Sequence, residues 1–189
     1  MSQHHHPLRH RPDFLLNGSP TGTLRESFPR WACTTDLTAP TTQVMTTVAV
    51  PLQAGDVITN ITFKSGATAA DTPTNWWFAL YSSASTPALL AQTADQTTGA
   101  WAANTAKTVA LATAQLITTP GVYYAAFMMK ATAVTSLVGR TLALAGASTG
   151  SISGQKALAQ TSGSSLTTTA PATVATPTDS ALVPYGVLT

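Results

Sequence analysis

The chain has 189 residues, and only 8% of them are charged, with 7 Asp and Glu against 9 Lys and Arg. About a quarter of the residues are charged in an average soluble domain. Threonine contributes 35 residues and hydrophobic types 44% of the chain. This composition argues against a helical bundle, because helix surfaces are normally charged, and Thr is a poor helix former that suits strands. The single cysteine, Cys33, excludes an internal disulfide and is expected to be a small hydrophobe that is buried or partly buried.

The charges are unevenly distributed along the chain. Residues 1–33 contain four arginines, two acidic residues and all four histidines, whereas the remainder has five basic and five acidic residues. The sequence therefore predicts a basic arm followed by a neutral body. Four arginines without interleaved aromatic residues are too few to indicate nucleic-acid binding, so an acidic protein neighbour is the expected partner of the arm.

Residues 1–43 are predicted to form an extended N-terminal arm. Five prolines interrupt them every five to eleven residues, and no hydrophobic periodicity is sustained. The arm has too many apolar residues for a solvated linker, so it is expected to pack against its own body or a neighbour. The candidate assembly residues of the arm are Arg9, Arg11, Phe14, Leu16, Arg25, Phe28, Arg30 and Trp31.

From residue 44 the pattern is that of strands separated by turns. Segments 44–51 and 57–64 are predicted strands, and the link 52–56 suits a hairpin. In segment 57–64, strict alternation places Val57, Thr59, Ile61 and Phe63 on one face. Segments 76–81 and 122–129 are apolar on both faces, which predicts central strands of a two-layer structure.

Weaker strand candidates complete the body at 88–93, 107–111, 141–145 and 181–188. Their spacing of about 8–14 residues predicts an all-β fold, an antiparallel β-sandwich or jelly roll spanning 44–189. Residues 146–180, rich in Gly, Ser, Thr and Ala, are interpreted as a surface excursion of this domain, with contact between subunits as one means of ordering it.

No motif indicates catalysis. Gly146–Gly150 matches the G-x-S-x-G pattern around Ser148, but no helix is predicted after it and all histidines lie on the arm. The histidines have no carboxylate placed to orient them as metal ligands. Asp56, Asp71 and Asp95 occur in turn contexts, where a carboxylate ordinarily accepts hydrogen bonds from nearby amides. We therefore expect no enzyme activity, no cofactor and no metal site.

The tryptophans offer candidate contact residues. Trp76 and Trp77 are adjacent on a strand, so their side chains point to opposite faces, and only one of them can lie in the inner core. Core or subunit packing is the favoured interpretation. Trp77 and Trp101 are the candidates for a subunit contact or, if exposed, for a surface that stacks against a glycan.

Four segments carry a resemblance to a known class of protein. The segments PLQAGD (51–56), TPTNWWFALY (72–81), LLAQ (89–92) and GVYY (121–124) resemble small virion proteins of tailed bacteriophages, especially those of actinobacterial hosts. The resemblance covers about residues 44–145. It implies a β-sandwich structural protein, usually a minor tail or similar virion component, without a cofactor.

These observations together predict a non-enzymatic phage virion structural protein. We expect it to be anchored by its arm to other virion proteins, to form a homo-oligomer, most simply a trimer, and to be assembled in the bacterial cytoplasm. No apolar stretch suits an export signal or a membrane span. A minor tail or fibre-like component is preferred to a capsid decoration protein, and a module binding host surface glycan is the alternative from a different class.

Overall fold

The computed structural model describes residues 23–143 and 153–189, and the regular secondary structure within them is almost entirely β-strand. The elements are β1 (Arg25–Glu26), the 3-10 turn η1 (Arg30–Ala32), β2 (Thr35–Asp36), β3 (Met45–Leu52), β4 (Val57–Lys64), β5 (Asn75–Tyr81), β6 (Leu89–Gln92), β7 (Ala106–Leu116), β8 (Gly121–Lys130), β9 (Val138–Thr141), β10 (Ala159–Ser162), β11 (Thr178–Asp179), β12 (Leu182–Pro184) and β13 (Gly186–Leu188). The predicted all-β fold is confirmed.

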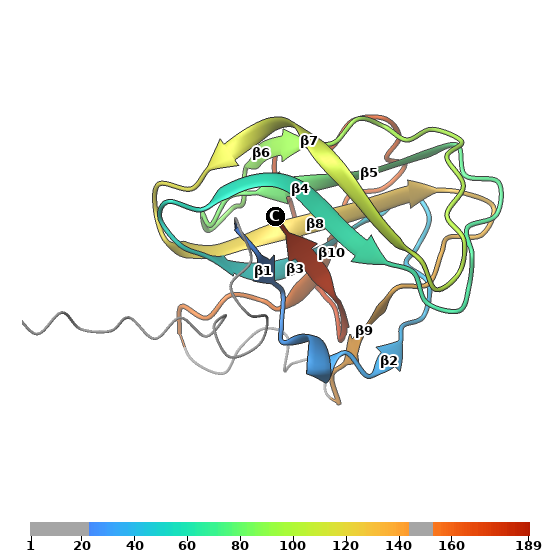
Figure 1. Ribbon diagram of the computed structural model, residues 1–189, viewed down its shortest axis with the longest axis horizontal. Coiled ribbons are helices and arrows are strands. Elements are labelled where there is room, and N and C mark those ends of the chain that lie inside the picture. Colours follow the sequence, from blue (N-terminus) through green and yellow to red (C-terminus); the bar gives the residue numbers. More distant parts are fainter. Residues whose placement is uncertain (1–22, 144–152) are drawn as a thin grey trace, which may run out of the picture.

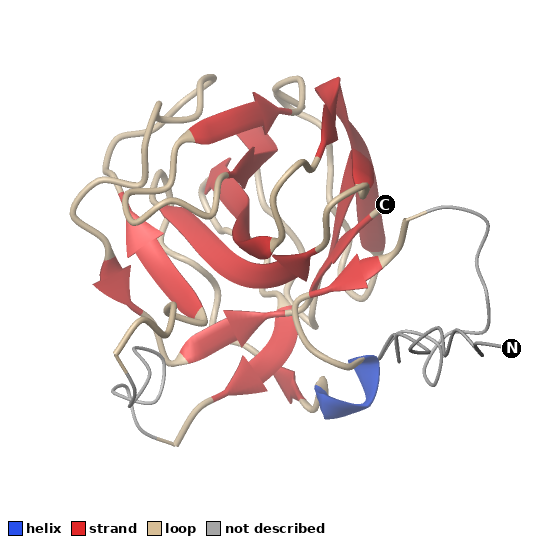
Figure 2. Cartoon of the chain, turned by 90° about the vertical axis from the view of Figure 1, so that its left-hand side faces the viewer, coloured by secondary structure: helices blue, strands red, loops and turns tan. Residues whose placement is uncertain are grey.

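Two antiparallel sheets form the body of the fold. One sheet has the strand order β1-β13-β4-β7 and the other the order β11-β10-β3-β8-β5-β6. Figure 1 looks onto the four-stranded sheet, with β4 in front of β8, and Figure 2 shows the strands from one end, surrounding the interior. A small third sheet, β12-β9-β2, lies beside η1. The arrangement is an antiparallel sandwich, whereas the jelly-roll connectivity stays a prediction.

The main core fills the space between the two large sheets. Its centre is a cluster of rings: Trp76 and Trp101 have centroids 5.2 Å apart, and Phe78 contacts both Trp101 and Phe63 at 5.7 and 5.1 Å. Aromatic pairs at such distances contribute about 0.5–1.5 kcal/mol each beyond the area that they bury. The continuous apolar runs of β5 and β8 thus supply the centre of the sandwich, as their sequences predict.

The predicted hairpin at 52–56 is wrong. Its two flanking strands lie in different sheets, since β3 pairs with β8 and β10 while β4 pairs with β7 and β13. The reason is visible in burial: β3 is buried on both faces, whereas β4 has one exposed face. Strands with such different surroundings belong to different layers, and the link, turning at Gly55 with φ +92°, crosses between them.

The predicted faces of β4 are also partly wrong. The buried residues are Ile58, Ile61 and Phe63, so strict alternation fails between the first and second. The register with β7 shifts at this point, between Ile58 and Asn60. On the other side of β4, the N–H groups of Thr59 and Asn60 both donate to the Thr189 carbonyl, so β4 has one extra residue there. This bulge turns Val57 outward, which a period-two pattern does not anticipate.

The Ser/Thr/Gly-rich excursion forms a second layer within the same chain. Its described part, residues 153–180, contributes β10 to the six-stranded sheet and then crosses the outer face of that sheet. There Ala170 and Val174 pack against Trp77, and the Trp77 indole donates a hydrogen bond to the Thr167 carbonyl at 2.7 Å. This part of the excursion therefore needs no neighbouring subunit for its order, although Gly, Ser and Thr are typical of linkers.

The weaker strand candidates have shifted boundaries. The candidate at 141–145 is observed earlier, as β9, and the candidate at 107–111 extends to residue 116 as β7. The candidate at 181–188 is split at Tyr185 into β12 and β13, which belong to different sheets. Among the described residues no helix is long and apolar enough to cross a membrane.

Candidate functional site

The candidate site is the point where the N-terminal arm joins the sandwich. We call residues 23–33 the arm root. β1 adds two residues to the four-stranded sheet, with Arg25 opposite Leu188 and Glu26 opposite Val187 in β13. Ser27 extends the pairing, since its backbone N–H donates to the Gly186 carbonyl at 2.9 Å. The arm root is therefore part of the sheet.

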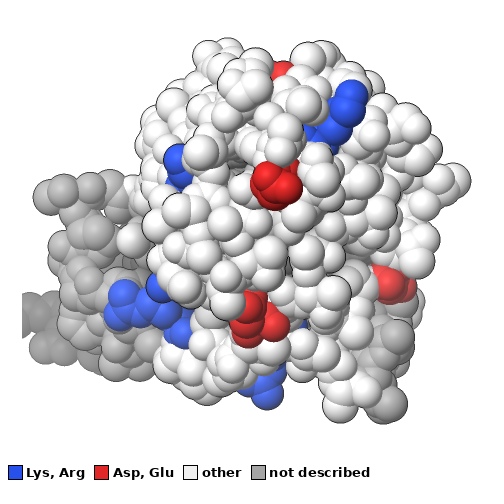
Figure 3. Space-filling model, turned by 90° about the vertical axis from the view of Figure 1, so that its right-hand side faces the viewer, with Lys and Arg blue, Asp and Glu red and all other residues white. Residues whose placement is uncertain are grey.

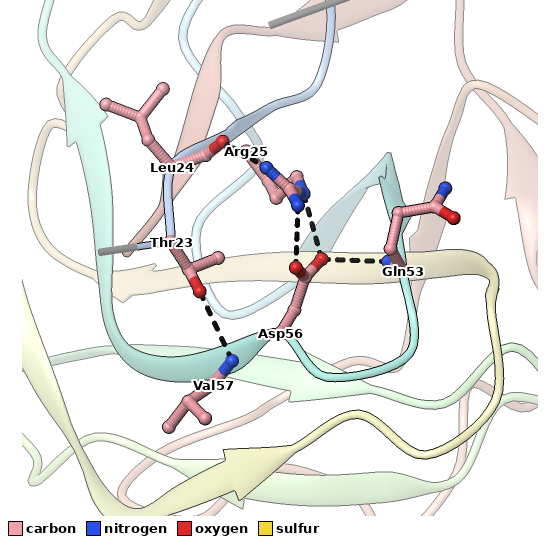
Figure 4. Close-up of polar contacts among 6 residues, drawn as sticks. All are labelled: Thr23, Leu24, Arg25, Gln53, Asp56 and Val57. Carbon is pink, nitrogen blue, oxygen red and sulfur yellow. Dashed lines mark hydrogen bonds and ion pairs between the residues drawn. The ribbon is translucent and has the colours of Figure 1, made fainter. Parts of the chain in front are cut away.

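An ion pair fixes the arm root to the turn between β3 and β4 (Figure 4). Arg25 donates from Nε to Asp56 Oδ2 at 2.8 Å and from Nη2 to Asp56 Oδ1 at 2.6 Å. The Gln53 backbone N–H also donates to Asp56 Oδ2, at 2.8 Å. Both charged side chains are nearly buried, at 13% and 6% exposure. Such a two-pronged geometry satisfies both carboxylate oxygens and is the strong form of an Arg–carboxylate contact.

A second attachment lies around Tyr185, between β12 and β13. The Phe28 and Tyr185 rings have centroids 5.5 Å apart, and the Tyr185 hydroxyl donates a hydrogen bond to Glu26 Oε1. Burial is the main cause that raises the pKa of Tyr185 above its ordinary value, and the bond to Glu26 adds to it. Phe28 also packs against the main core. The arm root thus contributes to the body's stability.

The exposed end of the arm root is η1. Trp31 is 73% exposed, the largest value among the exposed large hydrophobic residues of the described chain, and its neighbour Arg30 is also exposed. Trp and Arg are the residue types that most often dominate the binding energy of protein interfaces. This pair is available for contact with a partner.

The structure therefore divides the predicted assembly residues of the arm. Arg25 and Phe28 contact the chain's own sandwich, which is the first of the two alternatives expected for the arm. Arg30 and Trp31 are exposed, in keeping with an assembly role. The other four candidates, Arg9, Arg11, Phe14 and Leu16, lie outside the described residues.

Trp77 and Trp101 do not form an exposed contact surface. Trp101 is in the main core and its indole donates to the Thr105 carbonyl, while Trp77 lies under residues 166–174. Both are fully buried, so they do not form a glycan-stacking or subunit-contact surface, and of the favoured alternatives, core or subunit packing, the core is the one observed. The prediction that Trp76 and Trp77 point to opposite faces is also confirmed, because they belong to different core clusters.

The carboxylates of the body have structural partners. Asp95 accepts hydrogen bonds from the backbone N–H groups of Trp76 and Thr97, and Asp71 accepts one from the Thr72 hydroxyl. Asp56 binds a turn amide as predicted, but its ion pair with Arg25 was not anticipated. Within 23–143 and 153–189, no group of three His, Cys, Asp or Glu is placed to hold a metal. Ser148 and the four histidines lie outside the described residues.

Cys33 follows η1 at the end of the arm root and is partly buried. Desolvation raises the pKa of its thiol, and the positive charge of Lys64 opposes that effect. A thiol with a raised pKa is a poor nucleophile at neutral pH, because the thiolate is the reactive form. Cys33 therefore has the character of the small, partly buried hydrophobe that its sequence context predicts.

The body's surface is poor in charge. Figure 3 shows one face on which isolated acidic and basic side chains are separated by wide areas of uncharged atoms. Large hydrophobic side chains are exposed at few described positions, and two of these, Val57 and Leu116, are direct partners across β4 and β7. Sequence reasoning missed this pair, because the bulge in β4 and the C-terminal extension of β7 are both needed to expose it.

No model of a known protein family matches the chain, and a search of curated proteins finds no match.

Proposed function

We propose that the chain is a structural protein of a tailed-phage virion, in which the β-sandwich is the displayed body and the N-terminal arm is the anchor to other virion proteins. A minor tail or fibre-like component is the form that we propose, with several copies assembled on a particle. The proposal combines the resemblance of segments between residues 44 and 145 with the character of the arm root and of the surface.

The observation that carries the proposal is the fixed arm root. The ion pair between Arg25 and Asp56 holds the start of the described chain against the turn between β3 and β4, and Thr23 Oγ1 accepts a hydrogen bond from the Val57 N–H at 3.3 Å. A pulling force applied to the N-terminal side of residue 23 would therefore be transmitted directly to the sandwich. Firm attachment of this kind suits an anchored particle component.

The surface supports an assembly role. Few charges on the body mean few charged groups to desolvate when copies or neighbouring proteins pack closely, and an unpaired buried charge is costly. Arg30 and Trp31 add an exposed contact of the type that dominates protein interfaces. Many copies on one particle would gain avidity from individually modest contacts.

A deletion of residues 1–22 tests the anchoring role. Phage lacking the chain would be complemented with full-length or truncated protein, and the protein in purified particles would be quantified. We expect the truncated protein to fold, because the cut precedes Arg25 and Phe28, but to be missing from particles. A deletion of residues 1–33 is unsuitable, because it would remove both of these internal contacts. Normal incorporation of the truncated, folded protein would overturn the anchoring claim.

Copy number separates the tail from the capsid surface. A tail-tip or minor tail component is present in few copies per particle, whereas a decoration protein covers the whole shell. Quantitative mass spectrometry against the major capsid protein distinguishes them, and a ratio near one copy per capsid subunit would replace the tail assignment by the decoration alternative.

A further inference from the structure

Residues 166–174, which we call the strap, cover part of the outer face of the six-stranded sheet. Two aromatic side chains of β5 bind the strap through its backbone. The Trp77 indole N–H donates to the Thr167 carbonyl at 2.7 Å. The Tyr81 hydroxyl donates to the Pro171 carbonyl at 2.8 Å. Both rings are fully buried beneath the strap, so its floor is aromatic and carries hydrogen-bond donors.

Gln92 of β6 binds the strap backbone through both atoms of its side-chain amide. Its Nε2 donates to the Thr168 carbonyl at 2.7 Å, and its Oε1 accepts from the Ala170 N–H at 2.6 Å. Gln43, just before β3, donates from Nε2 to the Leu166 carbonyl at 3.2 Å. In each of these bonds the sheet supplies a side chain and the strap supplies its backbone. Bonds to the backbone recognise an extended segment with little dependence on its sequence.

Few side chains of the strap face the sheet. Leu166, Ala170 and Val174 pack against the cluster beneath the strap. The threonines at 167–169 are exposed. Pro171 lies in the middle of the strap, and the residue before a proline is biased towards extended backbone. The strap is therefore an extended segment held mainly by its carbonyl and N–H groups.

We propose that this face of the sheet, around Trp77, Tyr81 and Gln92, is a binding site for an extended, proline-containing segment of a partner protein, and that the strap fills it as an exchangeable internal ligand. Aromatic-lined grooves are a recurring means of binding such segments. The chain has no charged residue from 157 to 178, so the partner segment is expected to be uncharged as well. The inference goes beyond the proposed function and does not depend on it, because peptide binding is measured on the purified chain.

Left-handed backbone conformations flank the strap at both ends. Ser165 has φ 54° and Thr176 has φ 41°. For a β-branched residue such as Thr this conformation is an outlier, because its Cβ is crowded by the backbone. Strained residues of this kind cluster at ligand clamps and switch regions. Opening of the strap would release strain at both ends, which lowers the free energy that opening requires.

The strap competes with any segment supplied from outside. Because both of its ends belong to the same chain, its effective concentration at the site is high. If the open state is populated at about 1%, a separate peptide binds the wild-type chain about a hundredfold more weakly than it binds the open site. The test of binding therefore needs a variant whose strap is displaced, beside the wild-type chain.

Hydrogen exchange of the full wild-type chain, followed by mass spectrometry, tests whether the strap opens locally. The Leu166 N–H donates to the Gln43 carbonyl at 3.0 Å. The Val174 N–H donates to the Pro87 carbonyl at 2.9 Å. Both amides are protected while the strap is closed. We expect them to exchange at least about tenfold faster than the amides of β8, because local opening costs less than global unfolding. Equal rates would overturn the inference.

Two Val→Ala substitutions separate local from global opening. Val174 in the strap and Val183 in β12 are both buried, at 2% and 5% exposure. Val174→Ala should speed exchange of the strap at least about fivefold, because it removes a contact between strap and sheet. The matched control, Val183→Ala, destabilises the main core, so it should speed exchange of β8 and leave the strap unchanged. If Val183→Ala speeds both equally, the strap opens only with the whole fold and the inference fails.

Binding of a synthetic peptide of residues 163–176 tests the site itself. In the double variant Ala170→Asp/Val174→Asp, two charges on the buried side of the strap are expected to displace it and to leave the sheet unaltered. The wild-type peptide should bind this variant at least about tenfold more tightly than it binds the wild-type chain. It should also change the fluorescence of Trp77 as the ring is covered again. Gln92→Ala, added to the double variant, should weaken binding at least about fivefold.

Two control peptides test whether the backbone is what the site recognises. A peptide with Ala at 167–169 should bind within about threefold of the wild-type peptide. A peptide with Ala170→Asp and Val174→Asp should not bind. Circular dichroism checks the fold of the double variant, and if it is unfolded Val174→Ala takes its place, because its strap opens more often. A folded variant that leaves the wild-type peptide unbound at about 1 mM, or that binds it no better than the wild-type chain does, overturns the inference.

Discussion

Replacing Arg25 by Met tests whether the arm root stabilises the sandwich. The substitution roughly keeps the length of the side chain but leaves the Asp56 carboxylate nearly buried, with the Gln53 N–H still donating a hydrogen bond to it. Removing one member of a buried ion pair costs about 3–5 kcal/mol in the free energy of unfolding. Because Arg25 is 13% exposed, water can reach the site in part, and we expect the lower end, about 3 kcal/mol.

The loss is large enough to measure by two methods. For a chain of this size, 1 kcal/mol corresponds to about 2–4 °C in the midpoint of thermal unfolding, so Arg25→Met should lower Tm by roughly 6–12 °C. Urea unfolding followed by tryptophan fluorescence gives the free energy directly, because Trp76, Trp77 and Trp101 are buried in the folded state and exposed on unfolding.

A double-mutant cycle with Asp56→Asn isolates the pair. The Asn side chain can still accept from the Gln53 N–H, so the cycle removes mainly the charge interaction. Two residues in one network are expected to couple by about 1–3 kcal/mol. Arg30→Met is the matched control, because Arg30 is exposed, and it should change stability by less than about 0.5 kcal/mol. If Arg25→Met and Arg30→Met have equal effects, the arm root is not fixed by this ion pair.

Three further predictions follow from the core, a close backbone approach and the tyrosines. Trp77→Ala and Trp101→Ala should each cost about 3–5 kcal/mol, and a variant with normal stability but impaired adsorption to cells would restore the glycan-binding alternative. Gly139→Ala should lower Tm, because its Cβ would lie 2.3 Å from a backbone oxygen of β12, and an unchanged Tm would show that β9 and β12 can separate freely. Burial raises the pKa of Tyr81 and of Tyr185 above the ordinary value of 10.0, so the stability they contribute is fully present below pH 10 and is lost as the pH rises towards the folded-state values. Unfolding free energies measured from pH 8 to 12 should fall above about pH 10, less steeply in Tyr185→Phe; equal slopes would contradict this.

The strands that the sequence predicts best are those buried on both faces. The apolar runs of β5 and β8 need no information beyond their own residues, because any sheet that covers both faces will accept them. The pairing of the strands, in contrast, is not predicted by these local patterns. The links before β4 and β8 have ordinary hairpin composition, yet both cross between sheets, since pairing is decided by which faces the rest of the chain covers.

The layer over the six-stranded sheet is likewise not predictable from local sequence. Its composition is that of a linker, and only a few of its residues, such as Ala170 and Val174, cover the outward-pointing Trp77 side chain. The adjacency of Trp76 and Trp77 predicts that some second layer exists, because both side chains need burial. Which segment provides it depends on contacts more than 90 residues apart, which a local pattern does not contain.

The sequence predicted which segment of the chain makes contacts, but not which partner each of its residues contacts. Uneven charge and the apolar residues of the arm identify residues 1–43 as the segment that makes contacts. Whether Arg25 faces a neighbour or its own body depends on Asp56, 31 positions away, and a local pattern cannot pair them. The exposed pair Val57 and Leu116 depends on a bulge, and a bulge leaves no signature in a period-two pattern.

The central claim is the proposed place of this chain in a tailed-phage virion, and it is tested most directly by the amount of the chain in purified particles of the phage proposed to encode it. Quantitative mass spectrometry should detect the chain in gradient-purified particles, at few copies relative to the major capsid protein, and should detect it in the tail fraction after particles are separated into heads and tails. A chain that is abundant in the infected cell and missing from purified particles would contradict the account.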